Sequence, residues 1–342
     1  MPTDFAELEG KYDGLYAPRF EVQVGETTYT EADGLVTELE VDTIVDGADR
    51  CSFVLGAPFD PATGALAGVD WNQIAVGSGL LVSIGYADRL EPMFDGRVSS
   101  VRPAFSTDGP PAVEVNGYDR SFAMTHETRS RSWDETTDSD VVSDVVSAYE
   151  FAEVTVESTN VVHRKLFQES ESDYRFLVRL ADRNGFELFS RNGALAFRPP
   201  PYDADPVVTL QYGQSIGAFT PEFADETQVG TVEVRHWDPA NKREIVGTAE
   251  NPAGGDATRV FRLPVASKEE ADREAVAALD RLRNRTVSGS GESVGLPEVR
   301  AGETIRLENI DMFTNVYYVK GSIHRVSDSG YSTTFEVTER SL

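Results

Sequence analysis

The sequence contains very little cysteine and no long apolar run, and each shortage excludes a class of protein. Cys51 is the single cysteine among 342 residues, so the chain can form no internal disulfide and no thiolate metal cluster. It lies in the strand-like run Arg50 to Leu55, which predicts a small buried core residue and not a nucleophile. No stretch of about 18 apolar residues is present, so we expect no membrane segment. The acidic, polar N-terminus does not have the pattern of a secretory signal.

Basic residues are scarce as well. The chain has 31 Lys and Arg against 58 Asp and Glu, a formal net charge of −27, and only five of the basic residues are lysines. Such a chain repels nucleic acid, so we expect no stable nucleic-acid binding. An acidic surface with few lysines is typical of salt-loving organisms, because at 1 M salt a Debye length of about 3 Å screens self-repulsion. A merely acidic mesophilic protein is the alternative.

Strand-like runs alternate with turns in the first third of the chain. After an N-terminal arm, residues 1–17, the turns are rich in Gly, Asp and Pro. This spacing, without a long helical pattern, predicts a first tube-like β-barrel over residues 18–122. The predicted strands are Phe20 to Val24, Val36 to Val45, Cys51 to Leu55, Leu80 to Tyr86, Met93 to Val101 and Ala112 to Tyr118.

Helical periodicity appears over residues 123–205. Residues 138–149 place valines on one helix face, and Thr137 or Asp138 can cap that helix. A second helix is predicted over 172–184, with Gly185 in position to end it. A short hairpin follows, with strands at 187–189 and 194–197. We predict an α/β insert here.

Residues 206–342 return to strand patterns, at 207–212, 216–222, 231–237, 244–247, 304–307, 317–326 and 331–338. They also contain the clearest helix, 267–285, which Ser267 and Glu270 can open as a capping box. We predict a second β-barrel that includes this helix. The expected fold class is mainly β: two tube-like antiparallel β-barrels plus an α/β insert domain.

No catalytic or metal-ligating set stands out. The four histidines have no paired metal spacing, and the sequence around His236-Trp237-Asp238 lacks a nucleophile motif. The acidic groups Asp134-Glu135 and Asp138, Asp140 and Asp144 lack the glycine and closing glutamate of a calcium loop. We therefore expect no catalytic, cofactor-binding or metal residues. The remaining histidines are His126, His163 and His324, and the tryptophans Trp71, Trp133 and Trp237 are expected to be core or interface anchors.

In the segment from Gly295 to Arg340, the identity and spacing of individual residues are more specific than a β pattern requires. This segment resembles the end of the phage late control D family, the tail hub proteins of contractile phages and related injection machines, which are similar to the hub portion of type VI spike proteins. The matching residues are Arg300, Gly302, Tyr318, Val319, His324, Gly330, Tyr331, Thr333 and Phe335. The segments Glu171 to Phe186 and Gly79 to Val101 also resemble family motifs, so the resemblance covers Pro18 to Arg340.

The resemblance implies a structural role and no enzyme. Hub proteins of this family form a homotrimer whose six barrels adapt a sixfold tail tube to a threefold spike, around a lumen for DNA or protein cargo. The implied partners are the tail tube protein, a separate spike protein, because the chain ends at Leu342 after the last strand, and neighbouring baseplate proteins. The acidic composition, taken with this resemblance, leads us to expect a haloarchaeal virus or contractile injection system as the source. We expect assembly in the cytoplasm and incorporation into a virus tail or an extracellular injection particle.

Two other functions stay open at the level of sequence. A halophilic β-rich hydrolase with no recognisable motif is one, because the geometry of a carboxylate pair is invisible in sequence. A surface adhesin is the other, although it is expected to carry a secretion signal. The sequence does not distinguish a virus from a headless injection machine.

Overall fold

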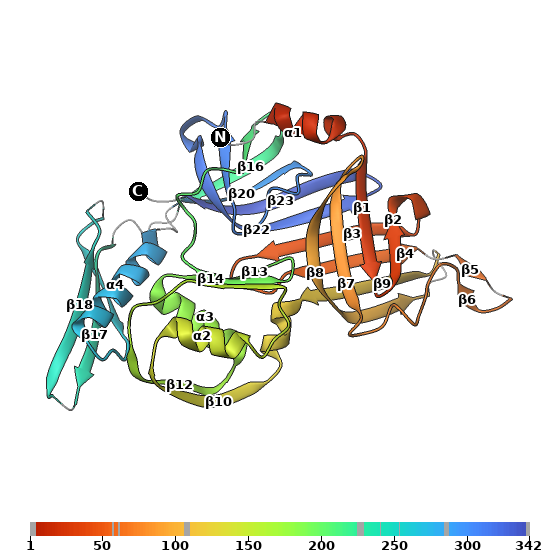
Figure 1. Ribbon diagram of the computed structural model, residues 1–342. Helices are drawn as coiled ribbons and strands as arrows, with labels where there is room; N and C mark the ends of the chain where they lie inside the picture. The colour runs from red at the N-terminus through yellow and green to blue at the C-terminus, as the bar shows by residue number, and fades with distance from the viewer. Residues whose placement is uncertain are drawn as a thin grey trace.

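The computed structural model describes residues 5–56, 58–60, 62–105, 110–223, 229–239, 241–252, 254–283 and 287–339. Most of these residues lie in strands, and most neighbouring strands are antiparallel, which confirms the mainly-β prediction. Figure 1 shows a large curved sheet with two smaller layered units beneath and beside it. No helix in the described part of the chain is long and apolar enough to cross a membrane.

One thirteen-stranded sheet forms the body of the molecule, in the order β16-β20-β23-β22-β3-β4-β9-β8-β7-β1-β2, with β21 paired to β22 and β15 paired to β21. Its strands alternate between buried and partly exposed side chains, as in Ala112–Asp119 (β9), because successive side chains point to opposite faces. The others are β1 (Pro18–Val24), β2 (Thr27–Thr30), β3 (Val36–Ile44), β4 (Arg50–Gly56), β7 (Gly79–Tyr86), β8 (Arg89–Ala104), β15 (Val208–Gln211), β16 (Ile216–Phe223), β20 (Val287–Val294), β21 (Thr304–Glu308), β22 (Asn315–Ser327) and β23 (Gly330–Glu339).

The two ends of the chain meet within this sheet. β22 pairs antiparallel with β3, from Gly321 opposite Ile44 to Ser327 opposite Glu38. The strands predicted for the first barrel and five of those predicted for the second are therefore hydrogen-bonded into one sheet, and a single hydrophobic core includes residues of both. The strands predicted at 231–237 and 244–247 lie in a separate sheet, so the predicted second barrel does not include them. The N-terminal helix α1 (Phe5–Lys11) lies across the top of this sheet in Figure 1 and buries Leu8 in the same core.

The predicted insert has three layers and its own core. α2 (Asp138–Val146) and α3 (Asp173–Asn184) lie between the antiparallel pair β10–β12 and the sheet β11-β14-β13 (Figure 1). Thr137 caps α2, and Gly185 ends α3 with φ 67°, both as the sequence indicates. The strands are β10 (Thr128–Thr136), β11 (Glu153–Val156), β12 (His163–Ser172), β13 (Glu187–Arg191) and β14 (Ala194–Arg198).

A third packing unit holds the helix predicted at 267–285, whose residues 284 and 285 lie outside the described chain. α4 (Lys268–Arg283) packs on the sheet of β17 (Val229–Asp238), β18 (Arg243–Glu250) and β19 (Ala257–Arg262), and not on the large sheet. The helix and the sheet are in close contact: a Cβ added at Gly247 would lie only 2.1 Å from the Ala271 backbone, so this position requires glycine. The alanine-rich face of α4 can therefore pack closely on β18 because β18 has a glycine at the point of contact. We call α4 with β17–β19 the helix–sheet unit.

The small elements complete the chain. They are the hairpin β5 (Phe59–Asp60) and β6 (Ala65–Leu66), which projects at the right of Figure 1, and the short helices η1 (Asp13–Leu15), η2 (Glu31–Asp33), η3 (Arg120–Thr125) and η4 (Asp311–Phe313). The division of the chain into domains at residues 18, 123 and 206 stays a prediction. The sequence did not indicate α1, β2, β5, β6, β10, β11, β12, β19 or β20.

Candidate functional site

Arg300 stands where the three predicted regions of the chain meet. Its guanidinium is 3% exposed and donates to the carbonyls of Pro92, at 2.8 Å, and Met93, at 2.9 Å, both on β8. It also donates to the Asn192 Oδ1, at 3.1 Å, in the β13–β14 turn of the insert. One side chain therefore fixes the loop before β21 to both the first part of the sheet and the insert.

Arg300 forms no direct hydrogen bond with a carboxylate among the described residues. Burial lowers the pKa of its guanidinium to about 10, the nearby Arg191 adds to this effect, and Asp49 opposes it. Burial also raises the pKa of the Asp49 carboxyl, and the neighbouring Asp119 adds to that. All three groups that accept hydrogen bonds from Arg300 are neutral, so geometry and not ion pairing sets this contact.

A buried chain of polar groups runs beside Arg300 across the β22–β3 pairing. The Ser322 Oγ lies 3.1 Å from His324 Nε2 and 2.9 Å from the Thr43 Oγ1 on β3. On the other side of the ring, His324 Nδ1 lies 2.8 Å from the Tyr331 hydroxyl and 3.2 Å from the Thr333 Oγ1. Every member is buried, so the network aligns β22 with β3 and with β23.

His324 is a buried cross-link between β22 and β23. Burial, with the charge of Arg300, lowers the pKa of its imidazole to about 3. Both ring nitrogens are engaged by hydroxyl groups, and its side chain is fully buried. His324 is therefore a packed residue of the interior.

The N-terminal arm closes the same region. The Tyr12 ring lies 5.5 Å from the Tyr86 ring, and its hydroxyl donates to the Glu298 carboxylate at 2.8 Å. Lys11 Nζ lies 2.6 Å from Glu91 on β8 and 3.0 Å from Glu298. The arm thus joins β7 and β8 to the loop that carries Arg300. We call this region the sheet joint: Lys11, Tyr12, Thr43, Tyr86, Arg300, Ser322, His324, Tyr331 and Thr333.

The other residues of the resemblance are also structural. The Tyr318 hydroxyl donates to the buried Glu187 of the insert. Gly302 has φ +83°, and a Cβ there would lie 2.7 Å from the Phe189 ring. Gly330, with φ +113°, forms the β22–β23 turn. The remaining two, Val319 and Phe335, are core residues.

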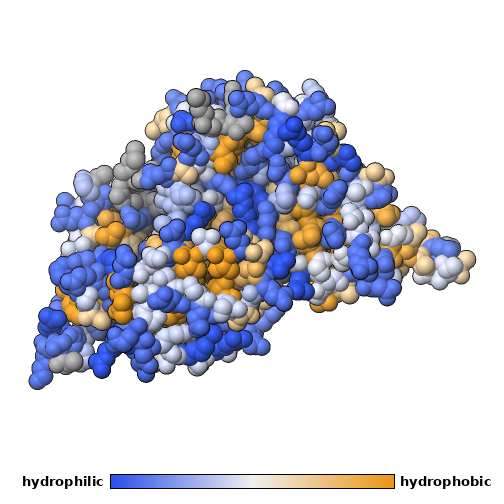
Figure 2. All heavy atoms as spheres, in the orientation of Figure 1, coloured by the Kyte–Doolittle hydropathy of each residue, from blue (hydrophilic) through white to orange (hydrophobic). Residues whose placement is uncertain are grey.

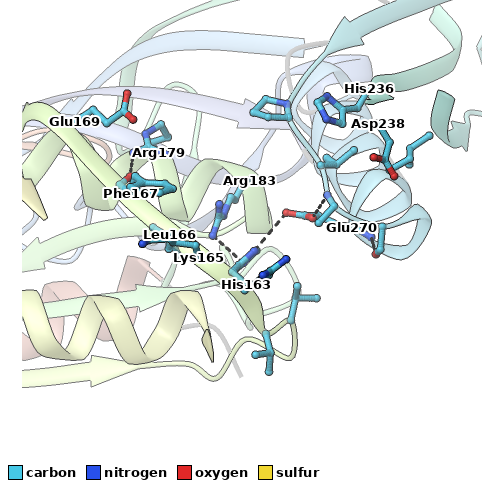
Figure 3. Close-up of a pocket in the computed structure, with 18 of the residues that line it drawn as sticks. His163, Lys165, Leu166, Phe167, Glu169, Arg179, Arg183, His236, Asp238 and Glu270 are labelled. Carbon is cyan, nitrogen blue, oxygen red and sulfur yellow. Dashed lines mark hydrogen bonds and ion pairs between the residues drawn. The ribbon is translucent and has the colours of Figure 1, made fainter. Parts of the chain in front are cut away.

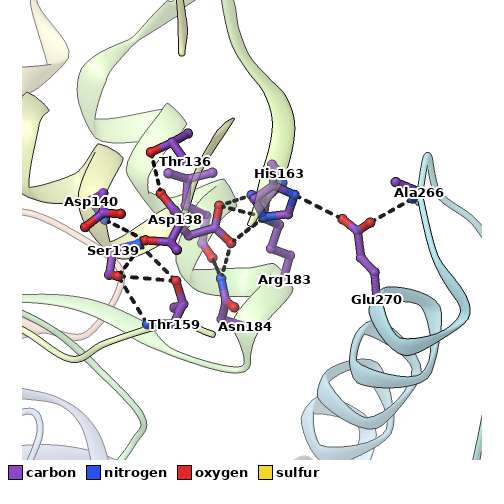
Figure 4. Close-up of polar contacts among 12 residues, drawn as sticks. Thr136, Asp138, Ser139, Asp140, Thr159, His163, Arg183, Asn184, Ala266 and Glu270 are labelled. Carbon is purple, nitrogen blue, oxygen red and sulfur yellow. Dashed lines mark hydrogen bonds and ion pairs between the residues drawn. The ribbon is translucent and has the colours of Figure 1, made fainter. Parts of the chain in front are cut away.

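A second buried network connects the insert to the helix–sheet unit (Figure 4). Asp138 is 2% exposed and accepts hydrogen bonds from Arg183, from Nε at 2.8 Å and from Nη2, and from the Asn184 amide at 2.7 Å. The His163 ring lies between Asp138, 3.4 Å away, and Glu270 of α4, 3.5 Å away. Burial lowers the pKa of His163. We call Asp138, His163, Arg183, Asn184 and Glu270 the unit joint.

The acidic residues considered for a cation are used in other ways. Asp138 is held by Arg183, and the Asp144 carboxylate accepts from the Trp133 indole at 2.9 Å. Within the described residues, no three His, Cys, Asp or Glu side chains gather as a metal site requires. The Ser267–Glu270 capping box forms in part: Ser267 accepts from the Glu270 amide at 3.1 Å, but the Glu270 carboxylate accepts from the amide of Ala266.

A groove of about 990 Å³ opens beside the unit joint (Figure 3). One wall is β12 with the exposed face of α3, and the other comes from β17, β18 and the start of α4. Five basic side chains line the first wall: Arg164, Lys165, Arg175, Arg179 and Arg183. His236 and Asp238, which flank Trp237 in the sequence, lie on the second wall.

The predictions for Cys51 and for the three tryptophans have different outcomes. Cys51 is fully buried, as predicted, and burial raises the pKa of its thiol. Trp133 stacks on Phe176, with ring centroids 5.4 Å apart. Trp71 and Trp237 are 45% and 59% exposed, so they do not anchor the core of this chain. Figure 2 shows a mostly hydrophilic face, with apolar residues gathered over β13 and β14 and beside β8.

Comparison with known proteins gives a family and a fold. The family model described as "Alg8 N-terminal domain" matches residues 20–328. No curated protein matches the chain. Among solved structures, the tail protein from Neisseria meningitidis MC58 is similar, with a TM-score of 0.73, 16% identity, and coverage of 95% of this chain and 97% of that one.

Two further structures share the fold. The 43 kDa tail protein of prophage MuSo2 from Shewanella oneidensis has a TM-score of 0.75 at 14% identity, over 94% of this chain and 98% of that one. The E. coli c3393 protein, described as a type VI secretion component with structural similarity to the T4 tail proteins gp27 and gp5, has a TM-score of 0.60 at 13% identity, over 90% and 74%.

Proposed function

The chain belongs to the Alg8 N-terminal domain family, and we propose that it is the structural baseplate hub of a contractile tail or injection particle. The observation that carries this proposal is the fold, which this chain shares over nearly its whole length with two proteins described as tail proteins. Four residues of the hub resemblance, Arg300, His324, Tyr331 and Thr333, add support, because they belong to the buried sheet joint. Such a joint suits a protein that acts by holding a shape.

We propose a homotrimer in which each subunit contributes two barrel-like halves of the large sheet. Six similar halves would then surround a lumen for DNA or cargo and adapt a sixfold tail tube to a threefold spike. The proposed partners are the tail tube protein, a separate spike protein and neighbouring baseplate proteins. Assembly would take place in the cytoplasm, before the hub enters a virus tail or an extracellular injection particle.

The geometry of the sheet supports ring closure. Its two terminal strands, β16 and β2, each pair on one side only among the described strands. Unpaired strand edges bind other strands readily. In a head-to-tail ring, β16 of one copy would face β2 of the next, and the contact would close after three copies if its rotation fits.

The test is the mass and shape of the purified protein. Light scattering in about 3 M salt, where a Debye length below about 3 Å screens the net charge, should give three times 37.5 kDa, and electron microscopy should show a ring with a central hole. The double variant Thr28→Lys/Ala218→Lys, at exposed positions of β2 and β16, should yield monomer. Thr258→Lys, on the edge strand β19, is the matched control and should leave the trimer intact.

A monomer that joins neither tube nor spike protein would contradict the hub. Hydrolysis of a polysaccharide by that monomer would favour the β-rich hydrolase instead.

A further inference from the structure

We propose that the groove between the insert and the helix–sheet unit binds an extended acidic segment of a partner protein. This site lies outside the large sheet and does not depend on the hub assignment. It can therefore fail while the trimer test succeeds, and the reverse also holds. Three features carry the proposal: the arrangement of the cations, the lack of an ion pair with a described residue at two of them, and the apolar side chains between them.

The cations come from two adjacent elements. Arg175, Arg179 and Arg183 are spaced four residues apart on α3, so they project from one helix face. Arg164 and Lys165 are exposed on β12, the strand packed beside that face. In a chain with a net charge of −27, five basic side chains on one wall are a local reversal of charge.

Two of these cations have no counter-charge in the described part of the chain. Arg164 and Arg175 are exposed, and neither forms an ion pair with a described residue. Lys165 has only a 3.5 Å contact with the exposed Asp134. By contrast, Arg179 is held by Glu171 and by the Phe167 carbonyl. The wall thus contains fixed cations that shape it and free cations that can receive a ligand.

Apolar surface lies among these charges. Phe167, on β12, is 48% exposed and Val162, just before that strand, is 60% exposed, and both line the groove. β12 pairs with β10 alone among the described strands, so its other edge is not covered by a strand. A segment carrying carboxylates and one or two apolar side chains would satisfy the free cations and cover these side chains together.

A peptide suits the groove better than a nucleic acid does. The lining also contains Glu169, Glu171, Asp238 and Glu270, which would repel an evenly charged phosphate backbone. A polypeptide can place carboxylates opposite the arginines and amides or apolar groups opposite the glutamates. The volume of about 990 Å³ is at the upper end of ordinary binding sites, which fits a short extended segment.

The test uses a fluorescein-labelled peptide of glutamates with two central phenylalanines. Fluorescence anisotropy would be recorded at the lowest salt concentration at which the circular dichroism of the protein is unchanged, because screening weakens such contacts. The wild-type protein should bind this peptide and should not bind the same peptide with lysine in place of glutamate.

The decisive variant is Arg164→Glu/Arg175→Glu, which removes only unpaired exposed cations. It should weaken binding at least tenfold. Arg259→Glu/Arg262→Glu, on the exposed strand β19 away from the groove, makes the same change in net charge and should change the affinity less than twofold. Equal losses in both variants would show nonspecific attraction and overturn the site, as would no binding by the wild type. Tighter binding of a single-stranded DNA oligomer than of the peptide would also overturn it.

Discussion

The sheet joint centres on a buried arginine, Arg300, and the unit joint on a partly buried one, Arg183, and the two are built differently. Arg300 donates only to neutral oxygens, on β8 and in the insert turn. Arg183 faces a carboxylate, Asp138, and contacts a histidine, His163, that lies 3.5 Å from Glu270 across the contact between units. Directed hydrogen bonds to neutral oxygens and close packing stabilise the sheet joint, whereas ion pairs stabilise the unit joint.

This difference indicates which contact is permanent. Hydrogen bonds to backbone carbonyls cannot be lost by protonation of the acceptor, and salt screens them little. The sheet joint also shares the largest hydrophobic core, whereas the helix–sheet unit has a separate core of its own. We therefore expect the large sheet and the insert to behave as one body, and the helix–sheet unit to respond more readily to solution conditions.

The largest expected effect breaks the sheet joint at the arm. Tyr12→Ala removes a fully buried ring and should lower the free energy of unfolding by about 3–5 kcal/mol. Tyr12→Phe keeps the ring and loses the bond to Glu298, so it should cost about 1 kcal/mol. Urea unfolding measures both. Similar losses in the two variants would mean that the hydroxyl, and not packing, holds the arm.

The next effect tests the neutral acceptors. Arg300→Met should destabilise the protein by about 3 kcal/mol, because two carbonyls and an amide oxygen lose their donor. Arg325→Ala, on the same strand as His324, removes an exposed arginine paired with Glu40 and should cost less than about 1 kcal/mol. Equal midpoints of denaturation for the two variants would contradict the role of Arg300.

Breaking the unit joint should cost less. Asp138→Asn leaves Arg183 without its carboxylate, but the Arg183 side chain is 20% exposed, so we expect a loss of about 2 kcal/mol. Asp140→Asn, an exposed acid in the same helix turn, should cost about 0.5 kcal/mol. Limited proteolysis should then release the helix–sheet unit first. Simultaneous cleavage of the large sheet would indicate that the unit joint supports the whole fold.

Acid should act on the sheet joint through His324. Its folded pKa is about 3, below the ordinary value near 6.5, so the unfolded chain takes up the proton first as the pH falls. The stabilisation is complete above about pH 6.5 and declines below it, by about 2 kcal/mol at pH 5. The difference in unfolding free energy between wild type and His324→Gln should shrink by that amount between these pH values. A constant difference would contradict the buried neutral ring.

The smallest effect concerns salt. Lys11→Met removes the bridges to Glu91 and Glu298, which are partly exposed, and should cost about 1 kcal/mol near 0.1 M salt and less near 1 M. Arg300→Met should show no comparable salt dependence. Denaturation at both salt concentrations separates the two kinds of contact, and an equal salt dependence would remove the distinction within the sheet joint.

Much of the fold was predictable because its signals are local. The strand at 112–118 shows its alternation in the sequence. Thr137 begins α2 through a side-chain hydrogen bond, and Gly185 ends α3 through its left-handed backbone conformation. Other elements gave weaker signals. The arm helix is short and acidic, and only the spacing of Leu8 and Tyr12 indicates its buried face. β10 is polar apart from Trp133 and depends on pairing with β12.

The candidate sites were less predictable than the fold. Sequence reasoning singled out His324 and Arg300 through a resemblance, without indicating what they contact. It identified helix 267–285 but not its partner sheet, because the fit of Ala271 against Gly247 depends on two surfaces and not on one pattern. The groove was missed entirely, since its cations come from two elements whose proximity is a tertiary fact.

The sequence by itself determined the mainly-β class, the ends of α2 and α3, and the strongly acidic surface, because composition, side-chain period and capping act over a few residues. Only the tertiary structure decided that Arg300 meets Pro92, 208 residues away, and Asn192, 108 residues away. It also decided that β22 pairs with β3. Such contacts depend on how separate surfaces fit and exclude water, and no local pattern in one strand specifies its distant partner.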